Sequence, residues 1–302
     1  MRMDTIKEQL STYNVAPAKN KALQDIEADP ALVRELHTLG LTDETIKAEL
    51  PLVSSYQDDR AYCKKCPGLE HCAKEPNPLA EMRLVFVDGL LQREYSPCAL
   101  YMAKDRLLKG YLYRDFPEDW LSSSPKTLPR SSRVISVLSA FMKAMKTPEQ
   151  SWVYLVGAMG SGRSFLLASY ANLLVNDGKK VAYLNSNKRF DELKGLAISA
   201  RPLFEKKMAE LENCDLLILD DFGSEYKSDY VRDQIVMPLL NERAKKSLPI
   251  FFASDFSLEE IQTLYSSDKT SAIYAKQLVN LIRLHSKAPV TVEKGFETHL
   301  ND

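Results

Sequence analysis

From about residue 134 onward, short apolar runs alternate with longer stretches in which apolar positions recur at helical spacing. The apolar runs predict buried β-strands at 152–156, 181–185, 216–219 and 249–253. The longer stretches predict helices at 134–145, 190–212, 230–245 and 271–285, with a further helix directly after residue 164. Such alternation predicts an α/β fold with a mainly parallel sheet and helices on both faces.

The first part of the chain has a different pattern. Residues 1–60 carry apolar side chains at helical spacing, such as Ile6, Leu10 and Leu32, and Thr42 is a candidate N-cap. Two short apolar-alternating segments, 82–87 and 90–95, flank Asp88-Gly89 and predict a β-hairpin. Prolines and consecutive serines within 117–133 indicate an extended connector. The expected organisation is a helical segment (1–60), a cysteine-bearing module (61–110), a linker (111–133) and the α/β domain (134–302).

A glycine-rich loop follows the first predicted strand of the α/β domain. Residues 157–164 read Gly-Ala-Met-Gly-Ser-Gly-Arg-Ser and lead into a predicted helix. Strand, loop and helix in this order form the context of a phosphate-binding P-loop, whose backbone N–H groups and helix N-terminus attract polyphosphate. The residues expected to bind a nucleotide are Gly157, Gly160, Ser161, Gly162, Arg163, Ser164 and Phe165, with the Ser164 hydroxyl on Mg²⁺.

Arg163 departs from the P-loop pattern, which has lysine at this position. A guanidinium is a wide planar fork, whereas an ammonium is a compact charge, so the two groups do not place charge in the same way. The positive charge is kept, which favours nucleotide binding. The changed shape predicts slow hydrolysis.

Three aspartates follow two of the other predicted strands. The strand at 216–219 ends in Asp220-Asp221, where a carboxylate beside a P-loop holds Mg²⁺ and a second one orients a water molecule. We assign the metal to Asp220 and the water to Asp221. Asp255 follows the strand at 249–253 and either faces the phosphates, where a third negative charge opposes the nucleotide, or is a solvated loop residue.

Composition and charge exclude several classes of protein. The net charge of −1 gives no overall field for nucleic acid or membranes, so a DNA contact must come from a local patch. No apolar run approaches the roughly 20 residues of a membrane span. The first residues lack the apolar stretch of a secretory signal, and a cytoplasmic location without membrane contact is expected.

Four of the five cysteines lie close together in the sequence. Cys63, Cys66, Cys72 and Cys98 have spacings typical of a tetrahedral zinc site, with His71 as the alternative to Cys72. A small module buries little apolar surface, so zinc would act as a folding element. Cys214 lies in an apolar segment and is expected in the core.

Several sequence motifs together resemble the DnaI-type bacterial helicase loaders, which are relatives of DnaC. Residues 63–72, Cys-Lys-Lys-Cys-Pro-Gly-Leu-Glu-His-Cys, are similar to the family's Cys-x-x-Cys-Pro-x-Leu-Glu-x-Cys. Residues 217–225 resemble its strand ending in Asp-Asp-Ile-Gly-Ala-Glu, 231–235 its Val-Arg-Asp-Glu-Val, and 248–256 its Leu-Pro-Thr-Phe-Phe-Thr-Ser-Asn-Phe. The likeness covers most of the chain.

The resemblance implies an AAA+ P-loop ATPase domain that binds ATP or ADP with Mg²⁺ and contacts single-stranded DNA. It also implies an N-terminal module that engages the hexameric replicative helicase, and self-association on binding ATP or helicase. Three positions depart from the family: Arg163 replaces lysine, Asp255 replaces the sensor asparagine, and Gln277 stands where the arginine finger is expected. Lys276 and Arg283 are the alternative finger residues, and Asp221 replaces the usual glutamate.

Three functions remain open from the sequence. The first is an ATP-dependent helicase loader of the replication primosome, and the second is an adaptor of the helicase that binds nucleotide without hydrolysing it. The third is a transposition-type AAA+ DNA regulator similar to the IstB group, against which the cysteine module argues. The stretch Lys188-Arg189-Phe190 is a candidate for stacking on single-stranded DNA, or else a solvated helix start.

Overall fold

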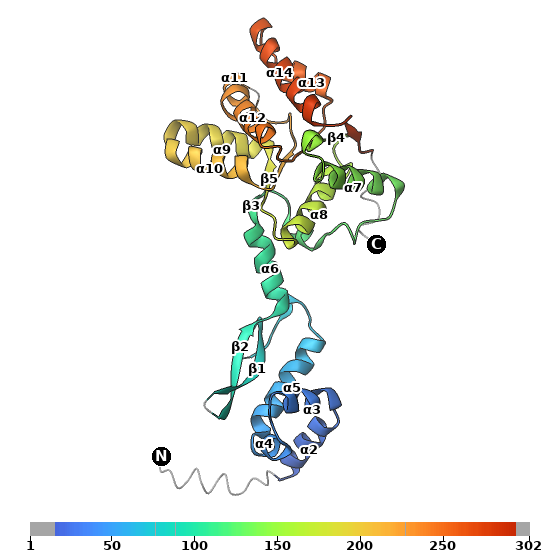
Figure 1. The fold of residues 1–302 in the computed structure, drawn as a ribbon, viewed down its shortest axis with the longest axis vertical. Coiled ribbons are helices and arrows are strands. Elements are labelled where there is room, and N and C mark those ends of the chain that lie inside the picture. Colours follow the sequence, from blue (N-terminus) through green and yellow to red (C-terminus); the bar gives the residue numbers. More distant parts are fainter. Residues whose placement is uncertain (1–15, 76, 88, 227, 294–302) are drawn as a thin grey trace. The chain divides into compact units, whose positions relative to one another are not determined.

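The computed structural model describes residues 16–75, 77–87, 89–226 and 228–293 (Figure 1). The chain divides into two compact units, Met1–Lys104 and Asp105–Asp302, called here the N-terminal and C-terminal units. The predicted helical positions Ile6 and Leu10 and the turn residue Asp88 lie outside the described residues. None of the described helices is both long and apolar enough to cross a lipid bilayer.

The described part of the N-terminal unit combines α-helices with a β-hairpin. Its elements are α2 (Ala16–Glu27), α3 (Pro30–Thr38), α4 (Asp43–Ala48), α5 (Leu50–Lys64), η1 (Leu69–His71), β1 (Ala80–Val87) and β2 (Leu90–Pro97). Leu32, Leu36 and Val53 are fully buried and pack in one cluster with Met82 and Leu84 of β1. The strands pair antiparallel with Val87 opposite Leu90, which confirms the predicted hairpin.

Side-chain caps fix where the N-terminal helices begin. The Asp29 carboxylate accepts hydrogen bonds from the N–H groups of Ala31 and Leu32, and Pro30 occupies the first turn of α3. Thr42 accepts a hydrogen bond from Thr45 N–H at the start of α4, so the predicted N-cap is confirmed.

The C-terminal unit contains a parallel sheet with helices on both faces, as predicted. The strand order is β3-β5-β6-β7-β4-β8. The strands are β3 (Tyr111–Arg114), β4 (Val153–Val156), β5 (Val181–Asn185), β6 (Leu216–Asp220), β7 (Ile250–Ser254) and β8 (Val290–Thr291). The helices of this unit and the segment leading into it are α6 (Ala99–Gly110), η2 (Glu118–Ser122), α7 (Ser132–Ala144), η3 (Pro148–Gln150), α8 (Arg163–Asn176), α9 (Ser186–Ser199), α10 (Arg201–Asn213), α11 (Asp229–Val231), η4 (Arg232–Val236), α12 (Met237–Lys245), α13 (Leu258–Leu264) and α14 (Lys269–His285).

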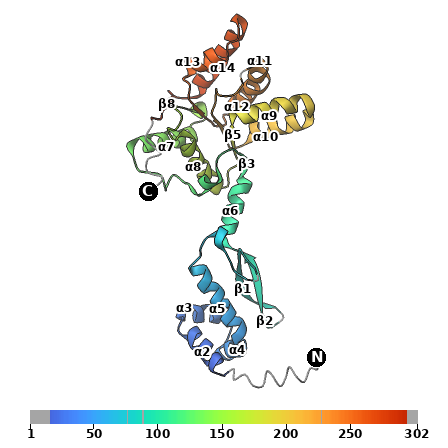
Figure 2. The same ribbon diagram turned by 180° about the vertical axis from the view of Figure 1, so that it is seen from behind.

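Each face of this sheet has its own hydrophobic cluster. Helices α7 and α8 cover one face, while α9, α10, α12 and α14 cover the other (Figures 1 and 2). Successive residues of a strand point to opposite faces, and Leu155 accordingly packs with the first cluster and Tyr154 with the second. Both faces are covered, which explains why the central strands β5, β6 and β7 are apolar up to their last residues.

Two predicted helices are each interrupted near a proline. The helix expected at 190–212 is broken at Ala200, two residues before Pro202, into α9 and α10. The helix expected at 230–245 contains a π-helical turn, η4, just before Pro238. Proline has no N–H to donate to the carbonyl oxygen four residues earlier in an α-helix. The backbone hydrogen bonding therefore changes at both places.

The segment predicted as a linker, 111–133, instead contributes to the core of the C-terminal unit. It contains β3, which pairs with β5 at the edge of the sheet, and the buried residues Phe116 and Leu128. The Trp120 and Ser123 carbonyls accept hydrogen bonds from the Asn172 amide of α8 at 2.7 and 2.9 Å. Prolines here interrupt helix formation without preventing the segment from packing.

Candidate functional site

The glycine-rich loop joins β4 to α8. Gly160 and Gly162 have φ values of 75° and 85°, in the left-handed region that other residues rarely adopt. A side chain at Gly157 would meet the backbone oxygen of Val292 at 2.2 Å, so only glycine fits at this position. The N-terminus of α8 opens directly out of this loop, as anion binding requires.

Two further loop residues have distinct environments. Ser161 is 1% exposed, and its hydroxyl has no hydrogen-bond partner among the described residues. A buried, unpartnered polar atom in a glycine-rich loop before a helix N-terminus fits a bound phosphate. The Phe165 ring packs edge-on against Trp120 at 5.3 Å between ring centroids, and so fixes the start of α8.

The predicted magnesium position is assembled at the ends of neighbouring strands. The Ser164 hydroxyl donates a hydrogen bond to one oxygen of Asp220 (2.9 Å), and the hydroxyl of Tyr183 on β5 donates to the other (2.7 Å). Burial raises the pKa of Asp220, and the nearby Asp221 carboxylate adds to that effect. A cation beside this carboxylate would stabilise its charged form, which suits a Mg²⁺ site.

Asp221 has a separate partner. Its carboxylate accepts a hydrogen bond from the Asn185 side-chain amide at 2.7 Å, and its backbone has a left-handed φ of 52°. The same Asn185 side chain caps α9 by accepting from Lys188 N–H. Sequence analysis missed both Tyr183 and Asn185, although polar residues on the strand next to a carboxylate-bearing strand could have indicated them.

Arg163 and Asp255, interpreted separately from the sequence, form an ion pair with each other. The Arg163 guanidinium donates one hydrogen bond to the Asp255 carboxylate and another to the backbone oxygen of Ser254. The N–H of Gly157 donates to the same Ser254 oxygen at 3.2 Å. The Arg163 side chain is 6% exposed and that of Asp255 is 30% exposed. The cation of the P-loop is therefore fixed to the end of β7.

A cavity of about 240 Å³ lies beside the loop. It is lined by Arg133 and Val137 of α7, Leu166 of α8, and residues 291–293. The Arg133 guanidinium pairs with the Glu293 carboxylate at 2.9 Å across the lining.

The four clustered cysteines line one cavity of about 100 Å³ in the N-terminal unit. All four are free thiols, at Cys63, Cys66, Cys72 and Cys98. Within the described part of the chain, no three His, Cys, Asp or Glu side chains are grouped closely enough to hold a metal ion. Binding one ion would require these thiols to move closer together. His71 does not line the cavity.

Three of these sulfurs accept hydrogen bonds, as metal-bound thiolates commonly do. Cys72 accepts from Leu79 N–H at 3.4 Å, and Cys98 accepts from Tyr101 N–H at 3.3 Å. Backbone N–H groups lower the pKa of Cys72. The Lys74 ammonium, which is 3.4 Å from the Cys63 sulfur, also forms a 2.6 Å ion pair with Asp59.

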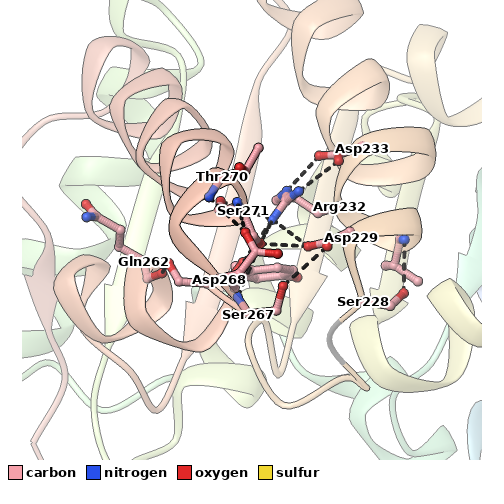
Figure 3. A network of polar contacts seen from close by, with 12 residues as sticks. Ser228, Asp229, Arg232, Asp233, Gln262, Ser267, Asp268, Thr270 and Ser271 are labelled. Carbon is pink, nitrogen blue, oxygen red and sulfur yellow. Dashed lines mark hydrogen bonds and ion pairs between the residues drawn. The ribbon is translucent and has the colours of Figure 1, made fainter.

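The motif at 231–235 forms a buried polar network around Arg232 (Figure 3). The Arg232 guanidinium pairs with Asp233 at 2.6 Å and Asp229 at 2.9 Å, and donates to the Tyr265 backbone oxygen and the Ser271 hydroxyl. These contacts connect the π-helical turn to the start of α14. The motif thus has a structural role in this chain.

The basic-aromatic stretch at the start of α9 is largely engaged within the protein. Phe190 is 1% exposed and cannot stack on a nucleic-acid base. Arg189 donates two hydrogen bonds of 2.6 Å to Asp115 and a third to Glu192. Lys188 remains 67% exposed, 3.6 Å from Asp115. Stacking by Phe190 was a wrong interpretation, because apolar packing in the core takes up this ring.

The arginine-finger region corresponds to α14. Gln277 and Lys276 are exposed on this helix. The Arg283 guanidinium donates to the Glu259 carboxylate of α13.

Cys214, predicted in the core, is 2% exposed.

Comparison with known proteins decides the family. The family described as IstB-like ATP binding protein matches residues 132–287, which hold the P-loop and the carboxylates Asp220, Asp221 and Asp255. The chain belongs to this family. It is also 25% identical to the replicative helicase loader DnaI of Bacillus subtilis (strain 168) over 297 residues, covering 93% of this chain and 92% of that protein. The resemblance to DnaI-type loaders is thereby confirmed, and it extends over both units.

Two solved structures share the fold. A crystal structure of DnaI matches with a TM-score of 0.51 and 20% identity, over 63% of this chain and 98% of that one. A protein from Streptococcus pyogenes serotype M3, described as a primosome component, matches with a TM-score of 0.50 and 22% identity, over 64% and 97% of the two chains.

Because Arg163 and Asp255 form an ion pair, we expect substitutions at the two positions to have coupled effects on the free energy of unfolding, even without nucleotide. Arg163→Met and Asp255→Asn should each destabilise the protein, but the double variant should lose less than the sum, by about 0.5–3 kcal/mol. Urea unfolding of the four proteins measures this coupling. Additive losses would show that the two side chains do not interact in solution.

Proposed function

We propose that this protein is a helicase loader of the replication primosome, which binds ATP and delivers the replicative helicase. The observation that carries the proposal is the similarity to the DnaI helicase loader across 93% of the chain, including the N-terminal unit. A regulator that shared only the ATPase half would match only the C-terminal unit. The cysteine cluster, which belongs to the N-terminal unit, argues against that class.

The C-terminal unit would bind the nucleotide. In this proposal the P-loop N–H groups hold the phosphates, while Ser164 and Asp220 hold Mg²⁺. The hydrogen bond between these two side chains supports the assignment, because it places both candidate ligands on one side of the loop. The cavity lined by Arg133, Val137 and Leu166 is our candidate for the base.

A hydrolysis-deficient adaptor is the second candidate function. The specific observation in its favour is that the Arg163 guanidinium is already engaged by the Asp255 carboxylate and the Ser254 carbonyl. Gln277 on α14 carries no charge to offer to a neighbouring molecule. Both candidates use the same nucleotide site and the same helicase contact, and they differ only in turnover.

Zinc would be held by Cys63, Cys66, Cys72 and Cys98, a donor set with the chemistry of structural zinc sites. The shared cavity and the N–H···S hydrogen bonds support this assignment. When bound, zinc would connect the end of α5 to the base of the hairpin and stabilise the module.

Single-stranded DNA binding by the C-terminal unit is part of the loader proposal. Exposed Lys188 at the start of α9 is the candidate contact from the predicted cluster. Its neighbours Arg189 and Phe190 are already committed to contacts within the protein. The expected DNA affinity therefore depends on charge more than on stacking.

Zinc binding has a direct test. Protein purified without chelators should contain about one equivalent of zinc per chain. Cys98→Ser should lower the zinc content and unfold the cysteine module while the C-terminal unit still melts cooperatively. Cys214→Ser, at the cysteine outside the cluster, should retain the metal. Elemental analysis giving well under one equivalent for the unaltered protein would contradict the assignment.

The helicase contact is predicted to lie in the N-terminal part. A fragment of residues 1–110 should retain the replicative helicase in a pull-down, because this part has its own core. Retention by residues 105–302, the C-terminal unit alone, would overturn the placement. Failure of the full-length protein to bind the helicase would overturn the loader function.

Turnover of ATP is predicted to be very slow, even with single-stranded DNA and helicase present. Arg163→Lys combined with Asp255→Asn should raise the rate by roughly 10- to 100-fold, because it supplies a compact cation without a competing carboxylate. Phosphate release from both proteins gives the comparison. Turnover by the unaltered protein at about 1 s⁻¹ or faster would contradict the slow-site proposal and point to Lys276 or Arg283 as the finger.

A further inference from the structure

The sheet topology places Asp255 between the phosphate loop and the magnesium position. Strand β7 is hydrogen-bonded to β4 on one side and to β6 on the other. All three strands are parallel, so their carboxyl ends meet at one edge of the sheet. The loop follows β4, Asp220 ends β6 and Asp255 follows β7.

A P-loop treats the inner and outer phosphates of a nucleotide differently. Backbone N–H groups cradle the inner phosphates, α and β, whereas the P-loop cation reaches the outer ones, β and γ. In this chain the inner cradle is intact, with the left-handed glycines and the buried Ser161 hydroxyl. The outer cation is engaged instead by Asp255 and the Ser254 carbonyl.

The contacts around Ser254 hold this arrangement in place. Its hydroxyl donates to the backbone oxygen of Phe222 at 2.6 Å and accepts from Phe256 N–H at 3.0 Å. Its carbonyl accepts from both Arg163 and Gly157. A planar guanidinium bound at two points does not reach elsewhere without breaking both hydrogen bonds.

We propose that the Arg163–Asp255 pair makes this site select nucleoside diphosphates over nucleoside triphosphates, and that Asp255 is the residue that determines the selectivity. This inference rests on the proposed nucleotide binding. A diphosphate occupies the cradle with the pair intact. A third phosphate either displaces the Asp255 carboxylate from Arg163 or brings negative charge beside it, and both cost free energy.

The expected selectivity follows from like charges at short range. Two negative charges a few ångströms apart near a protein surface repel strongly enough to change affinity by about tenfold or more. Mg²⁺ on Ser164 and Asp220 offsets part of the phosphate charge in both nucleotides, so the difference depends on Asp255. Replacing this carboxylate by an amide removes both the repulsion and the ion pair, so that only neutral acceptors compete with the third phosphate for Arg163.

Equilibrium binding to the full chain tests the selectivity. The probes are N-methylanthraniloyl-ADP and the matching β,γ-imido triphosphate, each with Mg²⁺ and monitored by fluorescence. The unaltered protein should bind the diphosphate about tenfold more tightly or better. Asp255→Asn should tighten triphosphate binding far more than diphosphate binding, and the ratio should approach one or reverse.

Two further variants control for folding and for overall charge. Arg163→Lys with Asp255→Asn keeps a cation and a polar partner, and should also favour the triphosphate if the single variant proves unstable in a thermal melt. Asp177→Asn removes an exposed carboxylate next to the opposite end of α8 and should retain the selectivity of the unaltered protein.

The contrary outcomes are distinct. Triphosphate binding at least as tight as diphosphate binding in the unaltered protein would overturn the selectivity alone. So would a ratio that Asp255→Asn leaves unchanged. Absence of binding of either nucleotide to every folded protein would overturn the nucleotide site itself, and the selectivity with it.

Discussion

The ion pair between Arg163 and Asp255 determines what the rest of the phosphate site can do. It joins the first residue of the P-loop helix to the end of β7 and holds the loop's cation inside the protein. A buried guanidinium needs an anionic or carbonyl partner, and this chain supplies both from within. Arginine at 163 and aspartate at 255 would each weaken a nucleotide site if present alone. Together, their opposite charges compensate each other.

The parallel sheet explains how such distant residues meet. Residues 163, 220 and 255 follow or end three different strands, β4, β6 and β7, whose carboxyl ends lie at one edge of the sheet. Asp220, the proposed magnesium ligand, accepts hydrogen bonds from Ser164 and Tyr183 at this edge. The departures from the family pattern, Arg163 and Asp255, lie on the side that would receive the outermost phosphate. A fold that keeps the cradle and changes its outer end is suited to binding nucleotide without rapid turnover.

The sequence predicted the elements that depend on local pattern. The P-loop context, the carboxylates at the end of β6 and the hairpin all have signals within a few residues, and the structure contains each element where expected. The pairing of Arg163 with Asp255 has no local signal, because the two residues are far apart in sequence. The available indication was that both positions depart from the family, with Arg in place of Lys at 163 and Asp in place of Asn at 255.

Other differences arose where tertiary packing overrides local pattern. Arg189 and Phe190 have the composition of a nucleic-acid contact, but the edge strand β3 supplies Asp115 just beyond its end and the core takes the ring. Residues 111–133 contain prolines and serines typical of a linker, yet Phe116 and Leu128 are buried. The cysteine spacing predicted a common site, and the four thiols do line one cavity. Zinc binding there remains a proposal.

The most direct test is a crystal structure of the full chain with Mg-ADP bound. The account predicts that the Arg163 guanidinium remains on Asp255 and the Ser254 carbonyl, while the loop N–H groups contact the diphosphate. A structure in which Arg163 binds the β-phosphate and Asp255 is solvated would contradict it.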